Sequence, residues 1–233
     1  MNFIGRKREL SLLHDKLGND RSECLLVYGR RRVGKSELIR TALKDTDAVV
    51  VQYVCRKAPF IQNLAGLAEA VAQAFDDEFV QFDRLDSLLK YIYHKAQQEK
   101  VVLFVDEYPF FRGDDEAIDS EFQIAIDTWQ HEACLKLILC GSYMETMQKL
   151  VESRAPLFGR FSEILKVQPF DYYDAGRFFP NRTNEEKLLL YSVFGGVPFY
   201  LQQVRDDLSP EENIEQLLVP EGSILENEIR LQL

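Results

Sequence analysis

Short apolar runs alternate with amphipathic stretches along this chain, and the alternation predicts strands separated by helices. Apolar runs at residues 24–28, 101–105 and 135–140, the last interrupted by Lys136, are typical of strands buried on both faces of a parallel sheet. The β-branched run 48–54 predicts a strand on the edge side of the sheet, and residues 164–167 predict a short fifth strand. Apolar positions at helical spacing predict helices over residues 6–17, 36–43, 62–75, 83–98, 117–131 and 143–151.

The chain changes character after about Asp171. Its apolar positions then recur only at helical spacing, over residues 172–178, 185–194, 198–206 and 211–217. Strands that alternate with helices in the first part require right-handed crossovers and a parallel sheet. We therefore predict an α/β domain with a five-stranded parallel sheet sandwiched by helices over residues 1–170, followed by a small all-helical subdomain over residues 171–233.

Residues 29–36 read Gly-Arg-Arg-Arg-Val-Gly-Lys-Ser and fit the spacing G-x-x-x-x-G-K-[ST] of a phosphate-binding loop. The segment lies between a predicted strand and a predicted helix, which is the context that its mechanism requires. Glycines let backbone N–H groups wrap a polyphosphate, and the helix N-terminus adds partial positive charge. The sequence therefore predicts a nucleotide site whose loop residues are Gly29, Arg30, Arg31, Arg32, Val33, Gly34, Lys35, Ser36 and Glu37.

Two side chains of this loop have distinct predicted roles. The ammonium group of Lys35 can reach the β- and γ-phosphates of a nucleoside triphosphate. The hydroxyl of Ser36 can serve as a ligand of the Mg²⁺ ion that accompanies the nucleotide.

Two carboxylates follow the apolar run 101–105. The C-terminal end of a parallel strand is where α/β sheets bind ligands, so Asp106 is a candidate to hold the Mg²⁺ ion. Side chains alternate along a strand, so Glu107 points to the other side and can act as a general base toward an attacking water. The alternative is that both residues simply end a strand at a solvated loop.

Ser142 follows the third apolar run. Its hydroxyl can hydrogen-bond the γ-phosphate or the attacking water. Serine is also a good helix N-cap, so Ser142 can instead cap the helix that is predicted to begin near Tyr143. The sequence leaves both roles open.

The composition narrows the classes of function. A formal net charge of −10 over 233 residues argues against a domain that binds nucleic acid along its whole surface. Positive charge is local at the arginines of the loop, which suit nucleotide or intersubunit contacts better than nucleic acid. Acidic residues outnumber basic ones after residue 205 and are typical of a solvated helical face.

The sequence also predicts the cellular setting. It has no run of 18 apolar residues, so we expect no membrane span, and its early charges exclude the apolar core of a signal peptide. The four cysteines, at 24, 55, 134 and 140, lie in or beside apolar segments without metal-ligand spacing. They indicate reduced core cysteines of a cytoplasmic protein.

Four motifs together resemble one known family. Residues 3–10 (Phe-Ile-Gly-Arg-Lys-Arg-Glu-Leu) are similar to the F-x-G-R-x-x-E-L box of AAA-like ATPases. The loop 29–36 has the G-R-R-R-V-G-K-[ST] form, and the segments 156–160 (Pro-Leu-Phe-Gly-Arg) and 195–201 (Gly-Gly-Val-Pro-Phe-Tyr-Leu) occur at the expected places. The chain thus resembles the archaeal-type ATPases, a group within the STAND and AAA-like branch of P-loop NTPases, over roughly residues 2–204.

The resemblance implies further site residues. The opening box lies over the adenine in such proteins, which makes Ile4, Gly5 and Arg6 candidates for base contacts. The helical subdomain resembles a lid that closes on the nucleotide and places Gly196 and Pro198 near the base and ribose.

Arg160 matches a position where relatives carry an arginine near the γ-phosphate, supplied to a neighbouring subunit of a homo-oligomer. Such an arginine finger stabilises the charge that develops in phosphoryl transfer. The alternative is a surface arginine that follows a glycine turn.

Three functions share these motifs. The first is a Mg²⁺-dependent ATPase that converts ATP to ADP and phosphate and thereby drives or gates a protein partner. The second is a STAND-type signalling scaffold that is gated by the bound nucleotide and turns over little. The third, a small-molecule kinase, is disfavoured because Glu107 suits attack by water. The chain lacks the N-K-x-D motif of guanine-specific proteins, which favours ATP over GTP.

The last residues of the chain carry a helical apolar stripe, made of Ile224, Leu225, Ile229 and Leu233. Relatives with these motifs continue into a winged-helix domain and a nuclease-like domain, through which any contact with nucleic acid would arise. We expect the stripe to be a leader into such domains or a terminal helix that docks on the lid or on another subunit. A frayed tail is the alternative.

Overall fold

The computed structural model describes residues 3–77, 80–129 and 132–220. Its internal contacts divide the chain into two compact units. We call residues 8–30 and 35–167 the sheet unit, and residues 3–7, 31–34 and 168–220 the helical unit. The loop after the first strand passes from one unit to the other and back. The predicted domain boundary between residues 170 and 171 stays a prediction, and the predicted apolar stripe at residues 224–233 lies outside the described residues.

Five parallel strands form the sheet of the sheet unit: β1 (Glu23–Tyr28), β2 (Val49–Val54), β3 (Val101–Asp106), β4 (Leu135–Gly141) and β5 (Glu163–Lys166). Their spatial order is β2-β3-β4-β1-β5. β1 and β4 pair from Glu23 with Lys136 to Tyr28 with Gly141, so the two strands end level with one another. β3 lies on the other side of β4. The C-terminal ends of β1, β4 and β3 therefore lie next to one another at the same end of the sheet.

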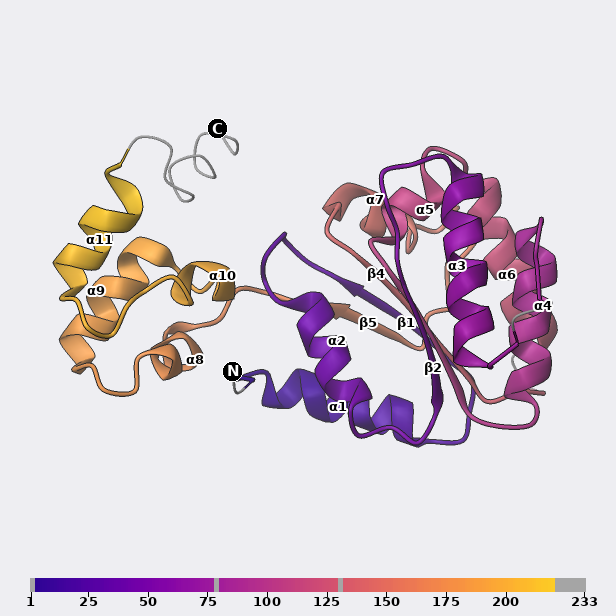
Figure 1. Cartoon of the computed structure of the whole chain (residues 1–233), viewed down its shortest axis with the longest axis horizontal. Coiled ribbons are helices and arrows are strands. Elements are labelled where there is room, and N and C mark those ends of the chain that lie inside the picture. Colours follow the sequence, from indigo (N-terminus) through magenta and orange to yellow (C-terminus); the bar gives the residue numbers. More distant parts are fainter. Residues whose placement is uncertain (1–2, 78–79, 130–131, 221–233) are drawn as a thin grey trace. The chain divides into compact units, whose positions relative to one another are not determined.

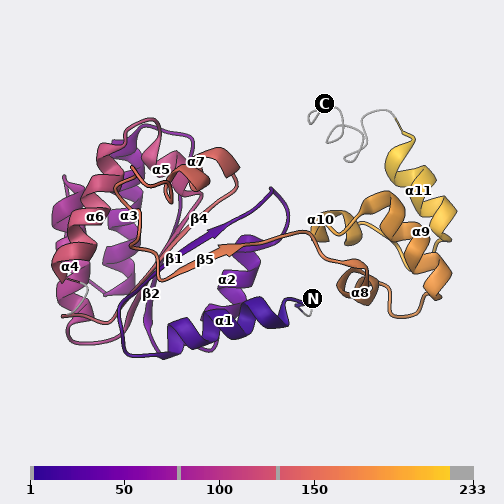
Figure 2. The same cartoon turned by 180° about the vertical axis from the view of Figure 1, so that it is seen from behind.

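Helices cover both faces of this sheet. Figure 1 shows α1 and α2 on one face and α3, α4 and α6 on the other, and Figure 2 shows the same layers from behind. The short helices α5 and α7 lie at the end of the sheet where the central strands finish (Figure 1). Their bounds are α1 (Lys7–Gly18), α2 (Lys35–Leu43), α3 (Phe60–Ala74), α4 (Leu85–Ala96), α5 (Tyr108–Arg112), α6 (Ala117–Trp129) and α7 (Met144–Lys149).

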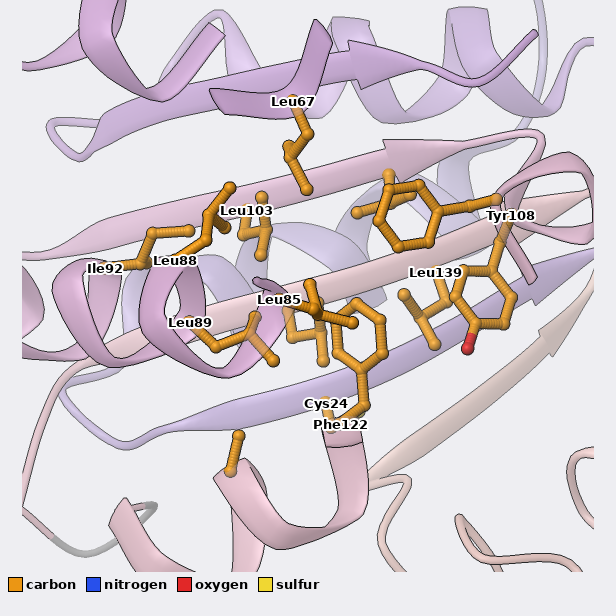
Figure 3. Packing of buried hydrophobic residues seen from close by; sticks show 14 of the residues in the cluster. Cys24, Leu67, Leu85, Leu88, Leu89, Ile92, Leu103, Tyr108, Phe122 and Leu139 are labelled. Atoms are coloured by element: carbon orange, nitrogen blue, oxygen red, sulfur yellow. The ribbon is translucent and has the colours of Figure 1, made fainter. Parts of the chain in front are cut away.

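The largest hydrophobic core lies between the sheet and α3, α4 and α6. Figure 3 shows Leu103 and Leu139 of the central strands packed against leucines of the helices and against Phe122. Alternate residues of β1, β3 and β4 belong to this core, and the residues between them point to the other face. β3 and β4 are buried along their whole length, which is why their sequences are mostly apolar rather than alternating, with Asp106 and Lys136 as their buried charged residues.

The helical unit contains α8 (Tyr172–Ala175), a 3-10 turn η1 (Gly176–Phe178), α9 (Asn184–Phe194), α10 (Pro198–Leu201) and α11 (Pro210–Leu218). Its core is built from six buried residues: Phe170, Ala175, Phe179, Leu190, Phe194 and Leu201. Capping boxes start α9 and α11, where Thr183 and Ser209 each accept a hydrogen bond from the amide of a glutamate three residues later.

The structure confirms the predicted five-stranded parallel sheet with flanking helices, and most predicted element ends lie within two residues of the observed ones. One prediction is wrong: the helix expected over residues 198–206 ends at Leu201. Side chains satisfy the backbone beyond it, because the amide group of Asn213 bonds both the N–H and the C=O of Arg205 at 2.7 and 2.9 Å. Helix α5 was not predicted at all.

Candidate functional site

The loop between β1 and α2 holds a buried lysine whose charge has no acidic partner. Lys35 begins α2, is 6% exposed, and donates from Nζ to the carbonyl oxygens of Gly29 at 3.0 Å and Arg30 at 3.1 Å. Within the described part of the chain, no carboxylate comes within ion-pair distance of this ammonium group. Arg32 and Gly34 take left-handed backbone conformations with φ of 67° and 88°. Such a loop directs backbone N–H groups inward and suits an anion.

Asp106 ends β3 as a buried carboxylate with weak compensation. It is 3% exposed, accepts a hydrogen bond from the amide of Glu107 at 3.0 Å and a weak one from the thiol of Cys140, and lies 3.8 Å from the guanidinium of Arg40. A buried carboxylate with so few partners is costly, so a cation fits beside it. Ser36 supplies a hydroxyl oxygen in the first turn of α2. These oxygen ligands are of the kind that Mg²⁺ prefers, and the other ligands would be phosphate and water oxygens.

The structure brings Glu107 and Ser142 together, although 35 residues separate them in sequence. The Ser142 hydroxyl donates to the Glu107 carboxylate, with both oxygens 2.8 Å from Oγ, and the Ser142 amide donates at 3.2 Å. Helix α7 has Tyr143 at its N-cap and no side-chain cap, so Ser142 does not cap it. The hydroxyl of Ser142 instead orients the candidate general base.

A buried network fixes the chain just after Glu107. The Tyr108 hydroxyl donates to Asp119 at 2.6 Å, and the Arg112 Nε donates to the other oxygen of the same carboxylate at 2.7 Å. Burial raises the pKa of Tyr108 well above its usual value, and the neighbouring Asp119 adds to the effect, so the phenol stays a donor. Sequence analysis missed these three residues. The Pro-Phe-Phe segment after Tyr108 and an aspartate at helical spacing from Arg112 were the available signals.

The predicted finger residue Arg160 forms a two-point ion pair. Its Nε and Nη2 donate to the two carboxylate oxygens of Asp127 on α6 at 2.9 and 2.7 Å, and Nη1 donates to the carbonyl of Phe158. The guanidinium is thus occupied within its own sheet unit, which sequence analysis did not anticipate.

In the helical unit, the opening box packs on the segment that follows the sheet. Arg6 is buried, donates from Nη2 to the carbonyls of Val33 at 3.1 Å and Gln168 at 2.5 Å, and lies 4.2 Å from the ring centroid of Phe170. Gly5 has φ of 69°, and a Cβ at Gly5 would lie 2.9 Å from the Phe170 ring. The box therefore holds the tip of the loop through a main-chain carbonyl.

Two further predicted residues lie in the same unit. A Cβ on Gly196 would lie 1.8 Å from the carbonyl oxygen of Phe170, so only glycine fits. Pro198 begins α10, and its Cγ would lie 3.9 Å from a Cβ on Gly34. The guanidinium of Arg32 stacks 4.1 Å from the ring centroid of Phe199. The helical unit thus brings together Gly5, Arg6, Arg32, Val33 and Gly34 with Gly196 and Pro198. Ile4, which precedes Gly5 in the sequence, is partly buried.

None of the helices that the structure describes is long and apolar enough to cross a membrane. No group of three or more histidine, cysteine, aspartate or glutamate side chains in the described residues could hold a metal ion by itself.

A parallel sheet in the order found here, with a phosphate-type loop after β1 and carboxylates after β3, defines a P-loop NTPase. A protein-family model described as an ATPase domain predominantly from Archaea matches residues 3–204. The chain belongs to this family, which confirms the resemblance drawn from its motifs and assigns it to ATPase-type, nucleotide-binding proteins.

One relative of the chain is a longer archaeal protein. An uncharacterized protein of Methanocaldococcus jannaschii is 26% identical over 204 residues, which cover 87% of the chain and 44% of that relative. The chain therefore spans less than half the length of this relative.

Solved structures share the fold. A Walker-type ATPase of Pyrococcus abyssi superposes with a TM-score of 0.70 at 21% identity, covering 99% of the chain and 76% of that protein. The ORC2 protein of Aeropyrum pernix, in ADPNP–ADP complexes, gives 0.62 at 14% identity, with coverage of 93% and 71%. At these identities the likeness establishes the architecture.

Proposed function

We propose that this chain binds ATP together with Mg²⁺ and hydrolyses it to ADP and phosphate. The observation that carries the proposal is the buried ammonium of Lys35, which rests on two carbonyls of its own loop at the start of α2. A buried cation without an anion is costly, and the phosphates of a nucleotide supply the missing charge. The ADPNP and ADP complexes of the similarly folded Aeropyrum ORC2 protein support an adenine nucleotide as the ligand.

The residues around the loop then have separate roles. Lys35 binds the β- and γ-phosphates, and the main-chain amides from Gly29 to Glu37 bind the remaining phosphate oxygens. Ser36 and Asp106 hold the Mg²⁺ ion. When bound, the ion neutralises charge that develops on the phosphates.

Glu107 acts in this proposal as the general base. Its carboxylate accepts the proton of a water molecule that attacks the γ-phosphate. Ser142 holds that carboxylate through its hydroxyl and its amide, and rotation of the hydroxyl toward the γ-phosphate of a bound nucleotide would remove the first of these two hydrogen bonds. The pair therefore connects occupancy of the phosphate site to the position of the base.

The remaining assignments concern the adenine of the nucleotide and two arginines, Arg6 and Arg160. We propose that the backbone at Ile4 and Gly5 contacts the adenine, with Gly196 and Pro198 near the base and ribose. Arg6 supports this site by holding the loop through the Val33 carbonyl. Arg160 is proposed to reach a neighbouring subunit after it leaves Asp127.

The output of the cycle is proposed to be the driving or gating of a protein partner by a cytoplasmic homo-oligomer. The alternative is a STAND-type scaffold in which occupancy matters and turnover is slow. Single-turnover and steady-state rates separate the two outputs: a rate at or below about 10⁻³ s⁻¹, the scale of unassisted switch GTPases, favours the scaffold.

The binding proposal is tested by Lys35→Ala. We expect at least a tenfold loss of affinity for a non-hydrolysable ATP analogue in calorimetric titration, because the buried phosphate charge loses its cation. Lys44→Ala is the matched control, since Lys44 is exposed just beyond the end of α2. Equal affinity of Lys35→Ala and wild type would exclude the loop as the binding site.

A further inference from the structure

The edge of the sheet formed by β2 lies outside the proposed nucleotide site and has the properties of a docking strand. β2 is the outermost strand on one side of the sheet and pairs in parallel with β3. The amides of Val49 and Cys55 donate toward β3, to the carbonyls of Lys100 and Asp106, both at 2.9 Å. Hydrogen-bonding groups alternate in direction along such a strand, so the even-numbered residues of β2 direct their N–H and C=O groups to the open edge.

Among the described residues of the sheet unit, this strand carries none of the usual protection against pairing. Natural edge strands carry charges, prolines or bulges that discourage the addition of another strand. β2 reads Val-Val-Val-Gln-Tyr-Val, keeps an unbroken register with β3, and leaves Val54 44% exposed. The opposite edge strand β5, by contrast, begins and ends with the charged residues Glu163 and Lys166.

A groove of about 440 Å³ runs beside this edge, between β2 and α3. Small residues of α3 form its floor: Ala65, Gly66 and Ala70. A Cβ on Gly66 would lie 2.6 Å from the hydroxyl of Tyr53, so the tyrosine ring lies directly on the helix backbone. Tyr53 fills the space over Gly66, and the volume that a bound chain can fill lies beside this ring, along Ala65 and Ala70.

The rim of the groove is rigid. Asn63 is 1% exposed and accepts hydrogen bonds from the Tyr53 hydroxyl at 3.0 Å and the Arg56 amide at 2.9 Å. Its own amide donates to the carbonyls of Arg56 at 3.0 Å and Phe110 at 3.1 Å. A preformed groove lowers the ordering cost of binding.

Two opposite charges flank the groove, Arg56 at the end of β2 and Glu69 on α3. Both side chains are exposed, and within the described residues neither makes an ion pair or a side-chain hydrogen bond. Gln62 and Gln73 complete the polar lining with amides that can bond peptide groups. A bound peptide could therefore meet the cation of Arg56, the anion of Glu69 and the side-chain amides of Gln62 and Gln73 along the outer side of β2.

We propose that β2 and this groove bind an extended segment of a partner protein, which adds to the sheet as a further strand. The segment places an acidic side chain against Arg56 and a basic side chain against Glu69. Main-chain hydrogen bonds to β2 supply affinity, and the two charges supply specificity, as in other cases of strand addition. A second copy of this chain is the poorer occupant, because its β2 carries no charged residue to answer either charge.

The probe for this surface is a phage-displayed library of random nonapeptides, selected on the immobilised chain without nucleotide. We expect enriched peptides that alternate β-branched residues and carry one acidic and one basic residue. The best peptide is then synthesised with a fluorescent label and titrated by fluorescence polarisation. Arg56→Glu and Glu69→Lys should each weaken it at least tenfold, and the double variant should prefer the peptide with its two charges exchanged. Arg154→Glu, an exposed charge reversal after α7, is the matched control and should bind normally.

Val54→Pro tests the strand edge itself. Proline is tolerated where an edge-strand N–H points to solvent, so the sheet should remain folded while peptide affinity falls at least tenfold. The proposal is overturned if no peptide is enriched over the uncoated support, or if all three variants bind the peptide as wild type does. Concentration-dependent dimers that Val54→Pro abolishes, without peptide binding, would assign the edge to a second copy. Circular dichroism melting establishes that each variant is folded, and the two surface charge reversals decide the question if Val54→Pro is not.

Discussion

Glu107 has a backbone conformation that non-glycine residues rarely adopt, with φ of 53° and ψ of 45°. This conformation costs of order 1–3 kcal/mol and persists only where the surroundings fix it. Here the buried bonds from Tyr108 and Arg112 to Asp119 hold the chain after it, and Ser142 holds its carboxylate. A strained carboxylate at the end of a central strand is consistent with the proposed role as a base.

We predict that Glu107→Gln preserves ATP affinity and lowers turnover. The amide keeps the shape of the carboxylate but cannot accept the proton of water, and the loss of a general base costs about 10²–10⁴-fold in rate. Phosphate release measures turnover, and titration with the analogue measures affinity. Glu152→Gln, an exposed glutamate, is the control. Wild-type turnover in Glu107→Gln together with a mild effect of Asp106→Asn would contradict the hydrolytic assignment.

The contribution of Ser142 to turnover can be measured separately from that of the general base Glu107. Ser142→Ala removes the hydroxyl that orients Glu107 and leaves the amide bond at 3.2 Å. We expect turnover to fall by about tenfold, less than for the base itself, because the base remains but is poorly oriented. Ser142→Thr keeps the hydroxyl and should recover most of the rate. Equal rates for Ser142→Ala and wild type would show that the hydrogen bonds to Glu107 do not contribute to hydrolysis.

At the scale of elements, close backbone contacts decide how the helical unit packs. Phe170 donates its amide to the carbonyl of Gly196 at 2.7 Å, just before α10. The two chain segments approach too closely for any side chain at Gly196. The segment after α10 is held in turn by the Asn213 side chain of α11. Non-helical chain between two short helices is therefore fixed by side-chain hydrogen bonds.

Gly196→Ala should therefore destabilise the helical unit. Its Cβ would meet a carbonyl oxygen at 1.8 Å, and because backbone cannot move aside as a flexible side chain does, we expect a cost of about 1–3 kcal/mol. Thermal melting by circular dichroism measures the loss, and ATP-analogue titration reports whether affinity falls with it. Gly18→Ala is the matched control, since a Cβ there has nothing within 4 Å. A melting temperature equal to that of wild type would show that the contact relaxes without cost.

At the scale of the whole molecule, the open question is how many chains make one working site. Arg160 is paired with Asp127 in the single chain, so action on another subunit requires that this pair opens. The pair is partly buried and bidentate, so opening it costs more than the about 0–1 kcal/mol of a typical surface pair, and a phosphate that accepts the same two N–H groups would offset that cost. An arginine in such a pair is compatible with a finger that is recruited on assembly.

We predict that specific activity rises with protein concentration and that a mixture of Arg160→Ala and Lys35→Ala regains part of the activity. One variant then supplies an intact arginine and the other an intact phosphate loop. Arg154→Ala, mixed in the same way, is the control for unspecific effects. Constant specific activity without rescue in the mixture would leave Arg160 with its observed structural role toward Asp127.

Much of the fold was predictable because its signals are local. The apolar runs of β3 and β4 and most of the helical stripes are patterns among residues close together in the sequence, and the structure confirms the strands and most of the helices that they predict. Helix α5 escaped prediction because it is one turn stabilised by a distant partner, Asp119, rather than by its own periodicity. The early end of α10 escaped for the same reason, since Asn213 replaces the helical hydrogen bonds of Arg205.

The sequence alone determined the class of domain, the position of the phosphate loop and the residues that follow the central strands, because strand, loop and helix propensities act between neighbours. Only the tertiary structure decided which of these residues meet. The parallel register of β1, β3 and β4 aligns their C-terminal ends, and there Ser142 donates a hydrogen bond to Glu107. It also paired Arg160 with Asp127 and left β2 as an open edge beside α3. Such contacts depend on strand order and on side-chain geometry across many residues, which no local pattern in a single sequence encodes.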